Sequence, residues 1–86
     1  MYDVYITYDD EQDRELLEMV NTKTPAYLHF YDMKTTEGKK GGWKVKSKYS
    51  AKLDPFVLIQ KDREETVFYS DGGKNAVRQL IKWLNG

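Results

Sequence analysis

The chain has 86 residues, 14 basic and 14 acidic side chains, and no cysteine. A chain of this length is expected to form one domain, residues 1–86, and the lack of cysteine excludes disulfides, thiolate metal ligands and thiol redox couples. Small secreted domains usually rely on disulfides, so we expect a reducing compartment, the cytoplasm. The N-terminus holds no apolar signal segment, and the longest apolar run, Phe56–Ile59, is too short to span a membrane, so no membrane partner is expected.

The first third of the chain predicts a strand, a helix and a second strand. Val4–Tyr8 is β-branched and aromatic, as is typical of a strand. Asp9 and Gln12 have the spacing of a capping box, which predicts a helix that ends near residues 21–23. Ala26–Asp32 follows as a strand. This order predicts a right-handed crossover and a parallel pair of strands.

Residues 33–54 form a basic insertion rich in glycine and lysine, whose structure the pattern leaves open. Three glycines, at positions 38, 41 and 42, argue against a continuous helix. From position 43 onward lysines alternate with other residues, which is the period of a strand with one charged face. We therefore expect either an extra strand or a functional loop.

The last third predicts a hairpin followed by a helix. Phe56–Ile59 is a continuous apolar run, typical of a central strand, and Thr66–Tyr69 returns as its hairpin partner after a charged turn. Asp71–Gly73 reads as a turn. The apolar residues that follow recur with helical spacing and predict an amphipathic helix; they are Val77, Leu80, Ile81 and Leu84.

This order of elements resembles the thioredoxin superfamily, and within it the small glutaredoxins. Asp54–Ile59 resembles the family segment in which a cis-proline precedes a central strand, and Tyr69–Leu80 is similar to the glutaredoxin Gly-Gly turn and last helix. The resemblance implies an α/β (α+β) fold, β-α-β-(loop or extra strand)-β-β-α, with helices packed on a mixed four-stranded sheet. It further implies a cis bond before Pro55, with this proline beside the start of the first helix.

The chain departs from the family at the position of the Cys-x-x-Cys motif. Tyr8-Asp9-Asp10-Glu11 stands there and holds no sulfur. Thiol–disulfide exchange needs a thiolate as the attacking group, and a carboxylate cannot replace it. The resemblance therefore implies a glutaredoxin-like domain that has no redox activity.

No other catalytic or metal-binding constellation stands out. The acids around the first helix do not have EF-hand spacing, and we interpret them as capping and dipole chemistry. His29 is the only histidine; Asp32 is three residues away on a strand and so lies on the opposite face, and we interpret His29 as a half-buried packing residue. The sequence thus predicts a protein that is not an enzyme and has no metal or cofactor.

A protein-binding module is the function we expect first. A thioredoxin-like sheet without its cysteines keeps edge strands that can pair with a peptide, and a groove beside the proline. The residues predicted to form this partner groove are Tyr8, Asp9, Asp10, Asp54, Pro55, Gly72 and Gly73.

Binding of single-stranded nucleic acid is the alternative. Residues 1–33 hold eight acids against two basic residues, whereas residues 34–52 hold seven lysines against one glutamate. Lysines on an extended ribbon neutralise phosphates and aromatic rings stack on bases. This basic and aromatic patch comprises Lys39, Lys40, Trp43, Lys44, Lys46, Lys48 and Tyr49. The same lysines are also explained as protection of a sheet edge against aggregation. The opposite net charges of residues 1–33 and 34–52 could also bring copies of the chain together as homo-oligomers.

Overall fold

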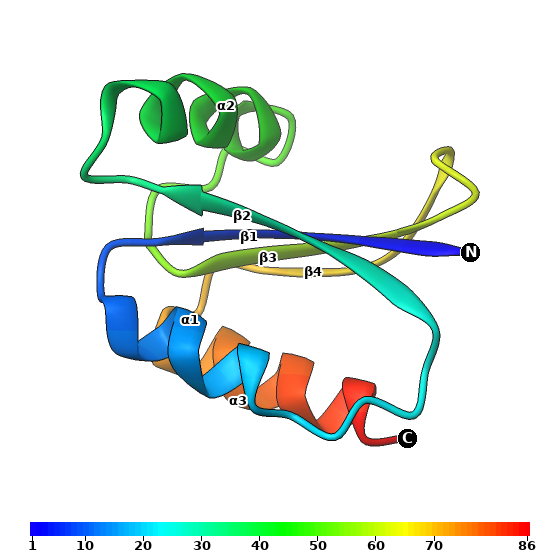
Figure 1. Cartoon of the computed structure of the whole chain (residues 1–86). Coiled ribbons are helices and arrows are strands. Elements are labelled where there is room, and N and C mark those ends of the chain that lie inside the picture. The colour runs from blue at the N-terminus through cyan, green and yellow to red at the C-terminus, as the bar shows by residue number, and fades with distance from the viewer.

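Residues 1–86 are described by a computed structural model, in which three helices pack on one four-stranded mixed sheet (Figure 1). The elements are β1 (Tyr2–Tyr8), α1 (Glu11–Glu18), β2 (Ala26–Asp32), α2 (Thr36–Ser47), β3 (Phe56–Lys61), β4 (Glu65–Ser70) and α3 (Lys74–Leu84). The strand order is β2-β1-β3-β4. No helix is both long and apolar enough to cross a bilayer.

The strands and the last helix confirm their predictions. β2 spans Ala26–Asp32 and pairs parallel with β1, as the strand–helix–strand order predicts. β3 lies centrally between β1 and β4 and is antiparallel to both. The Asp54–Pro55 bond is cis. The register that pairs Thr7 with Phe56 places Pro55 level with the end of β1, just before α1 begins.

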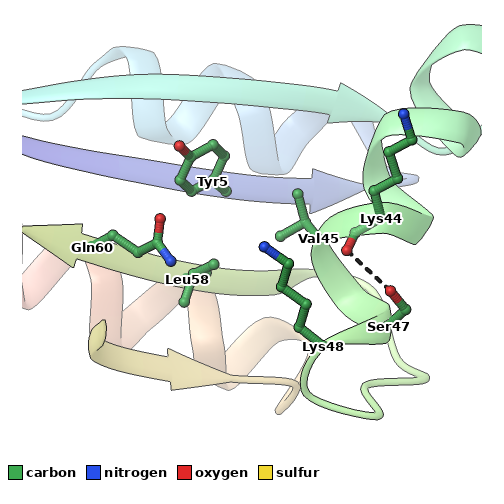
Figure 2. A pocket seen from close by; sticks show the side chains of 7 residues that line it. All are labelled: Tyr5, Lys44, Val45, Ser47, Lys48, Leu58 and Gln60. Atoms are coloured by element: carbon green, nitrogen blue, oxygen red, sulfur yellow. Dashed lines mark hydrogen bonds between the residues drawn. The ribbon is translucent and has the colours of Figure 1, made fainter. Parts of the chain in front are cut away.

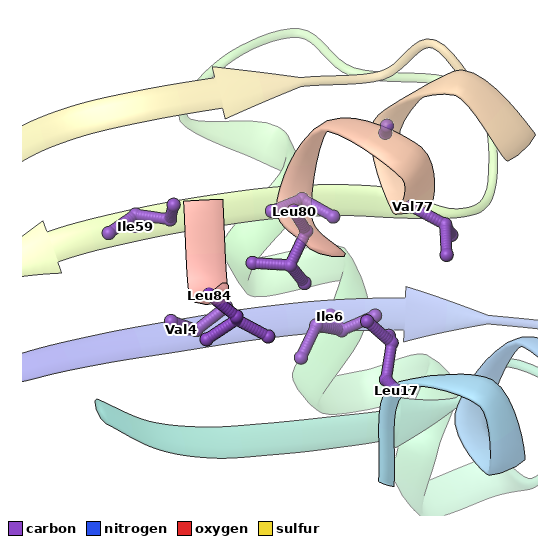
Figure 3. Close-up of a cluster of buried hydrophobic side chains, with 9 residues drawn as sticks. Val4, Ile6, Leu17, Ile59, Val77, Leu80 and Leu84 are labelled. Atoms are coloured by element: carbon purple, nitrogen blue, oxygen red, sulfur yellow. The ribbon is translucent and has the colours of Figure 1, made fainter. Parts of the chain in front are cut away.

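The main core fills the space between the sheet and the layer formed by α1 and α3 (Figure 3). Val4 and Ile6 of β1 contribute one wall, and Leu80 and Leu84 of α3 the other; all four are fully buried. Burial of each such side chain stabilises the fold by about 1.5–3 kcal/mol. This layer fixes α1 and α3 on one face of the sheet, while α2 lies on the other face (Figure 1).

α1 starts one residue later and ends earlier than predicted. Asp10, not Asp9, is the N-cap, and its carboxylate accepts a hydrogen bond from the Gln12 amide at 3.0 Å. The helix ends at Glu18, and of its residues only Asp13 and Leu17 are buried. Leu16 is 49% exposed, and Met19 is 81% exposed.

The prediction for residues 33–54 was wrong, because residues 36–47 form the helix α2. Thr35 caps it and accepts a hydrogen bond from the Gly38 amide at 2.9 Å. The three glycines that argued against a helix are the reason that α2 packs so closely against the end of β2 and the residue that follows it. A Cβ at Gly38 would strike the Asp32 carbonyl, one at Gly41 the Tyr31 ring, and one at Gly42 the Met33 thioether.

The alternation of lysines in this segment therefore has no structural meaning. With 3.6 residues per turn, the inward face of α2 carries Gly42, Val45 and Lys46 rather than every second residue. Lys46 is buried, whereas Trp43 is 56% exposed. The basic segment is thus one helix with an amphipathic arrangement, not a ribbon.

Candidate functional site

α2 covers only one end of its face of the sheet. It stands over the end at which β1 and β2 finish, and no helix lies over the other end (Figure 1). Tyr27, near the start of β2, is 60% exposed at that uncovered end, and Tyr69 of β4 is 53% exposed. Strand alternation and register bring these two tyrosines to the same face of the sheet as Tyr5, His29 and Gln60. We call the five together the open sheet face: Tyr5, Tyr27, His29, Gln60 and Tyr69.

Two rings of the open sheet face form a fixed wall. His29 and Tyr5 are register partners on neighbouring strands, and their rings stack with centroids 4.7 Å apart and planes 16° apart. The imidazole Nε2 of His29 lies 2.9 Å from the buried Asp3 carboxylate. His29 is half-buried, as predicted, and its acidic neighbour is Asp3 of β1.

A pocket of about 430 Å³ lies between this wall and the C-terminal half of α2 (Figure 2). Its apolar surface comes from Tyr5, Val45 and Leu58, while Gln60 and Ser47 add polar groups. A volume of this size is within the range of ligand-binding pockets. We call it the α2 pocket; Lys44 and Lys48 complete its lining.

Tyr49 anchors the segment after α2 beside the pocket. Its ring packs against Tyr69 with centroids 4.5 Å apart, and its hydroxyl lies 2.6 Å from the Thr66 hydroxyl. It also packs on Phe56 at 5.9 Å. Tyr49 of the predicted basic and aromatic patch is therefore held in place by β3 and β4, and this fixes the end of α2 relative to the sheet.

Lysines form a row along the outer side of α2. Lys40, Lys44 and Lys48 are spaced four residues apart, so they lie on one side of the helix, about 6 Å apart along its axis. All three are exposed and none forms an ion pair. We call them the lysine row. Two of its members reach the rim of the α2 pocket, which gives an apolar pocket a positively charged border.

Lys46 does not belong to this surface. Its ammonium group lies 2.9 Å from the Asp54 carboxylate, and only 2% of its side chain is exposed. It also lies 5.1 Å from the centre of the Trp43 ring. The structure thus divides the predicted patch: Lys39, Lys40, Lys44, Lys48 and Trp43 stay accessible, whereas Lys46 and Tyr49 are engaged within the protein.

The residues of the predicted partner groove do gather at one end of the sheet. A Cβ at Gly73 would lie 3.8 Å from the Asp54 carbonyl, and Pro55 follows Asp54. Gly73 has φ 62° and is the N-cap of α3, which confirms the predicted turn. Tyr8 is buried, and its hydroxyl accepts a hydrogen bond from Arg14 at 2.9 Å. Binding of a partner at this groove stays a prediction.

Most charged groups at this end are paired with one another, and Asp9 is exposed without an ion pair. Lys74 donates to Asp10 at 2.9 Å and to the buried Asp13 at 2.8 Å. The hydrogen bond from Lys74 lowers the pKa of Asp10, and the bond to Asp13 is the main cause that raises the pKa of Lys74. Asp54 is likewise occupied, by Lys46 and by the Thr7 hydroxyl at 2.6 Å.

The concave sites of the molecule lie away from the groove. Besides the α2 pocket there are two: one of about 440 Å³ between β4 and α3, and one of about 300 Å³ beside Met1 and Tyr27. Neither is lined by a groove residue. No three potential metal ligands come together anywhere in the chain.

The sequence-based prediction did not include Tyr5, His29, Leu58 and Gln60 as site residues. Each belongs to a strand whose position was correctly predicted, but their exposure depends on how far α2 extends over the sheet. A period-two pattern identifies residues that share a face and does not show which part of that face a helix covers.

Comparison of the chain with protein-family models, with curated proteins and with solved structures gives no match.

Proposed function

We propose that this chain is a non-catalytic binding protein with a thioredoxin-like architecture, and that its partner is a protein with an acidic surface. The strand order β2-β1-β3-β4, one parallel pair and helices on both faces of the sheet support the architecture. The absence of cysteine supports the non-catalytic part, because no thiolate is available for exchange.

The observation that carries the proposal is the α2 pocket with its lysine border. Tyr5, Val45 and Leu58 offer an apolar surface to a partner side chain, and Lys44 and Lys48 stand at its rim. Aromatic residues with apolar surroundings are frequent hot spots of protein interfaces. Because the lysine row lacks acidic partners within the chain, it favours an approaching acidic group and speeds encounter.

The open sheet face extends the contact area beyond the pocket. The Asp3 carboxylate borders its ring wall and lies 2.9 Å from the His29 Nε2. The partner groove at Pro55 is the less favoured site, because two of its three carboxylates, those of Asp10 and Asp54, already form ion pairs within the chain.

Single-stranded nucleic acid is the second candidate, and the lysine row beside the exposed Trp43 is the observation that favours it. Three lysines neutralise about three phosphates of a single strand. A plot of the logarithm of the binding constant against the logarithm of the salt concentration should then have a slope of about −2. Fluorescence anisotropy with labelled oligonucleotides tests this function. Binding at low salt that disappears in Lys40→Glu/Lys44→Glu/Lys48→Glu supports it, and a flat titration at low salt contradicts it.

Site-specific photo-crosslinking in the cells that produce the protein tests the primary proposal. A photoreactive amino acid replaces Gln60 at the α2 pocket, and in a matched control it replaces Arg78 on the outer side of α3. We expect protease-sensitive adducts from position 60, lost when Lys44→Glu/Lys48→Glu is added, and none from position 78. Nuclease-sensitive adducts, or equal yields at both positions, contradict the proposal.

A further inference from the structure

We propose that one partner of this surface is a second copy of the chain, with α1 of one copy docked on the α2 pocket and lysine row of the next. This inference rests on the proposed function, since it names an occupant for the same site. It arises from the outward side of α1, which the fold leaves uncovered.

The outward side of α1 combines acidic and apolar groups. Glu11, Glu15 and Glu18 are exposed on it, and of these only Glu18 forms an ion pair, with Arg14 at 3.3 Å. Met19 is the C-cap of the helix and is 81% exposed. We call these four residues together with the half-exposed Leu16 the acidic helix side.

The two surfaces are complementary in spacing and in chemistry. Glu11 and Glu15 are four residues apart, as are Lys40, Lys44 and Lys48, so both sets of charges repeat at about 6 Å along a helix. Met19 supplies a flexible thioether, which packs favourably against aromatic rings. The Tyr5 ring in the α2 pocket is available for that contact.

The arrangement of the layers determines the kind of assembly. α1 and α2 lie on opposite faces of the sheet (Figure 1), so the two surfaces belong to opposite sides of the molecule. Contacts between two different surfaces of this kind do not close as a two-fold dimer; they form a larger ring where the rotation between copies closes and an open chain where it does not. Because an eight-residue helix buries little area, the association is expected to be weak and sensitive to salt.

Sedimentation velocity over a concentration series, from low micromolar to about millimolar, tests the inference with the full chain. In low salt we expect the average mass to rise continuously, without a plateau at the dimer. The dissociation constant is expected to rise about tenfold on going to physiological salt, as the loss of two or three surface ion pairs requires.

Charge reversal on each surface makes the test specific. Lys44→Glu/Lys48→Glu removes the positive rim, and Glu15→Lys/Glu18→Lys reverses the acidic helix side in the half of α1 where the helix dipole favours positive charge. We expect each variant alone to stay monomeric and an equimolar mixture of the two to associate again. Circular dichroism checks that both variants fold.

A control pair of substitutions changes the net charge of the chain by the same amount, but outside the lysine row. Lys39 lies about 140° around α2 from Lys44, and Lys52 lies beyond the helix, so Lys39→Glu/Lys52→Glu should associate as the unaltered chain does. A monomer at all concentrations, a plateau at the dimer, or a mixture that stays monomeric overturns the inference. Crosslinks from position 60 to a different protein, together with a monomeric chain, overturn it while leaving the proposed function intact.

Discussion

The ammonium group of Lys46 lies 2.9 Å from the carboxylate of Asp54, which joins the inward side of α2 to the residue before Pro55. The carboxylate also accepts a hydrogen bond from the Thr7 hydroxyl of β1. The inward side of α2, the residue before Pro55 and the distant strand β1 thus meet at one carboxylate. This contact fixes α2 over one end of the sheet, and so determines which part of the sheet stays open.

Lys46→Met is expected to lower the free energy of unfolding by about 3 kcal/mol, because it leaves a largely buried carboxylate without its cation. Lys46→Met/Asp54→Asn should be less destabilised than the two single variants added together. Urea unfolding of the four proteins in a double-mutant cycle measures the coupling. The matched control is Lys44→Met, an exposed position expected to change stability by no more than about 0.5 kcal/mol. Equal effects at positions 44 and 46 would show that the ion pair does not anchor α2.

Thr7 provides a second test of the same junction. Its hydroxyl oxygen accepts the hydrogen bond of the buried Phe56 amide at 3.0 Å, and its hydroxyl donates to Asp54. Thr7→Val should cost about 1–3 kcal/mol, because the amide then has no acceptor. Thr7→Ser keeps the acceptor and should retain more stability. Hydrogen exchange at the Phe56 amide reports the difference directly, and equal protection in both variants would contradict it.

Alanine substitutions in α2 should separate helix propensity from packing. Alanine is favoured over glycine in a helix by about 1 kcal/mol, yet we expect Gly38→Ala and Gly42→Ala to destabilise the protein. Gly38→Ala should be the more costly, because its Cβ meets the Asp32 backbone, whereas that of Gly42→Ala meets the flexible end of Met33. Thermal unfolding checks the order. The exposed control Ser47→Ala should be neutral or slightly stabilising, and a gain in stability at position 38 is incompatible with the close approach of α2.

The pairing of Lys74 with Asp10 and Asp13 predicts a defined pH dependence. The hydrogen bond from Lys74 lowers the pKa of Asp10 below 3.8, so this stabilisation is present above that pH and is lost as the pH falls through the folded-state pKa. The pKa of Lys74 is raised above 10.5, chiefly by Asp13, so its contribution is present below that pH and is lost as the pH rises through the folded-state pKa.

Lys74→Met should therefore reduce stability between about pH 5 and about pH 9, and the difference should shrink toward about pH 2. It should also raise the pKa of the Asp10 carboxyl toward 3.8. Carbon-detected NMR titration of that carboxyl measures the shift, with Lys82→Met as the control on the same helix. An unchanged Asp10 titration in Lys74→Met is the result that contradicts the pairing.

The strands and α3 could be predicted because their patterns are local. The apolar run before Gln60 and the helical spacing of Val77, Leu80 and Leu84 follow from burial alone. α2 could not be predicted in this way, because its glycines serve contacts with Asp32, Tyr31 and Met33 that exist only after the chain has folded. The alternating lysines then favoured a strand, although one of them is buried against Asp54.

The candidate site could likewise be predicted only in part. The open sheet face lies on strands that the sequence predicts well, but its extent depends on the position of α2, so Tyr5 and Gln60 were not predicted as site residues. The partner groove residues do lie together, because strand order brings Pro55 to the end of β1. Their pairing with Lys74 and Lys46 depends on side-chain positions that no sequence pattern shows.

The central claim is that a partner binds at the α2 pocket rather than beside Pro55. Photo-crosslinking from position 60 compared with position 9 tests it most directly, because Asp9 is an exposed member of the partner groove. We predict protein adducts from position 60 at several times the yield from position 9. Adducts that form mainly from position 9 would contradict the claim and assign the partner to the groove at Pro55.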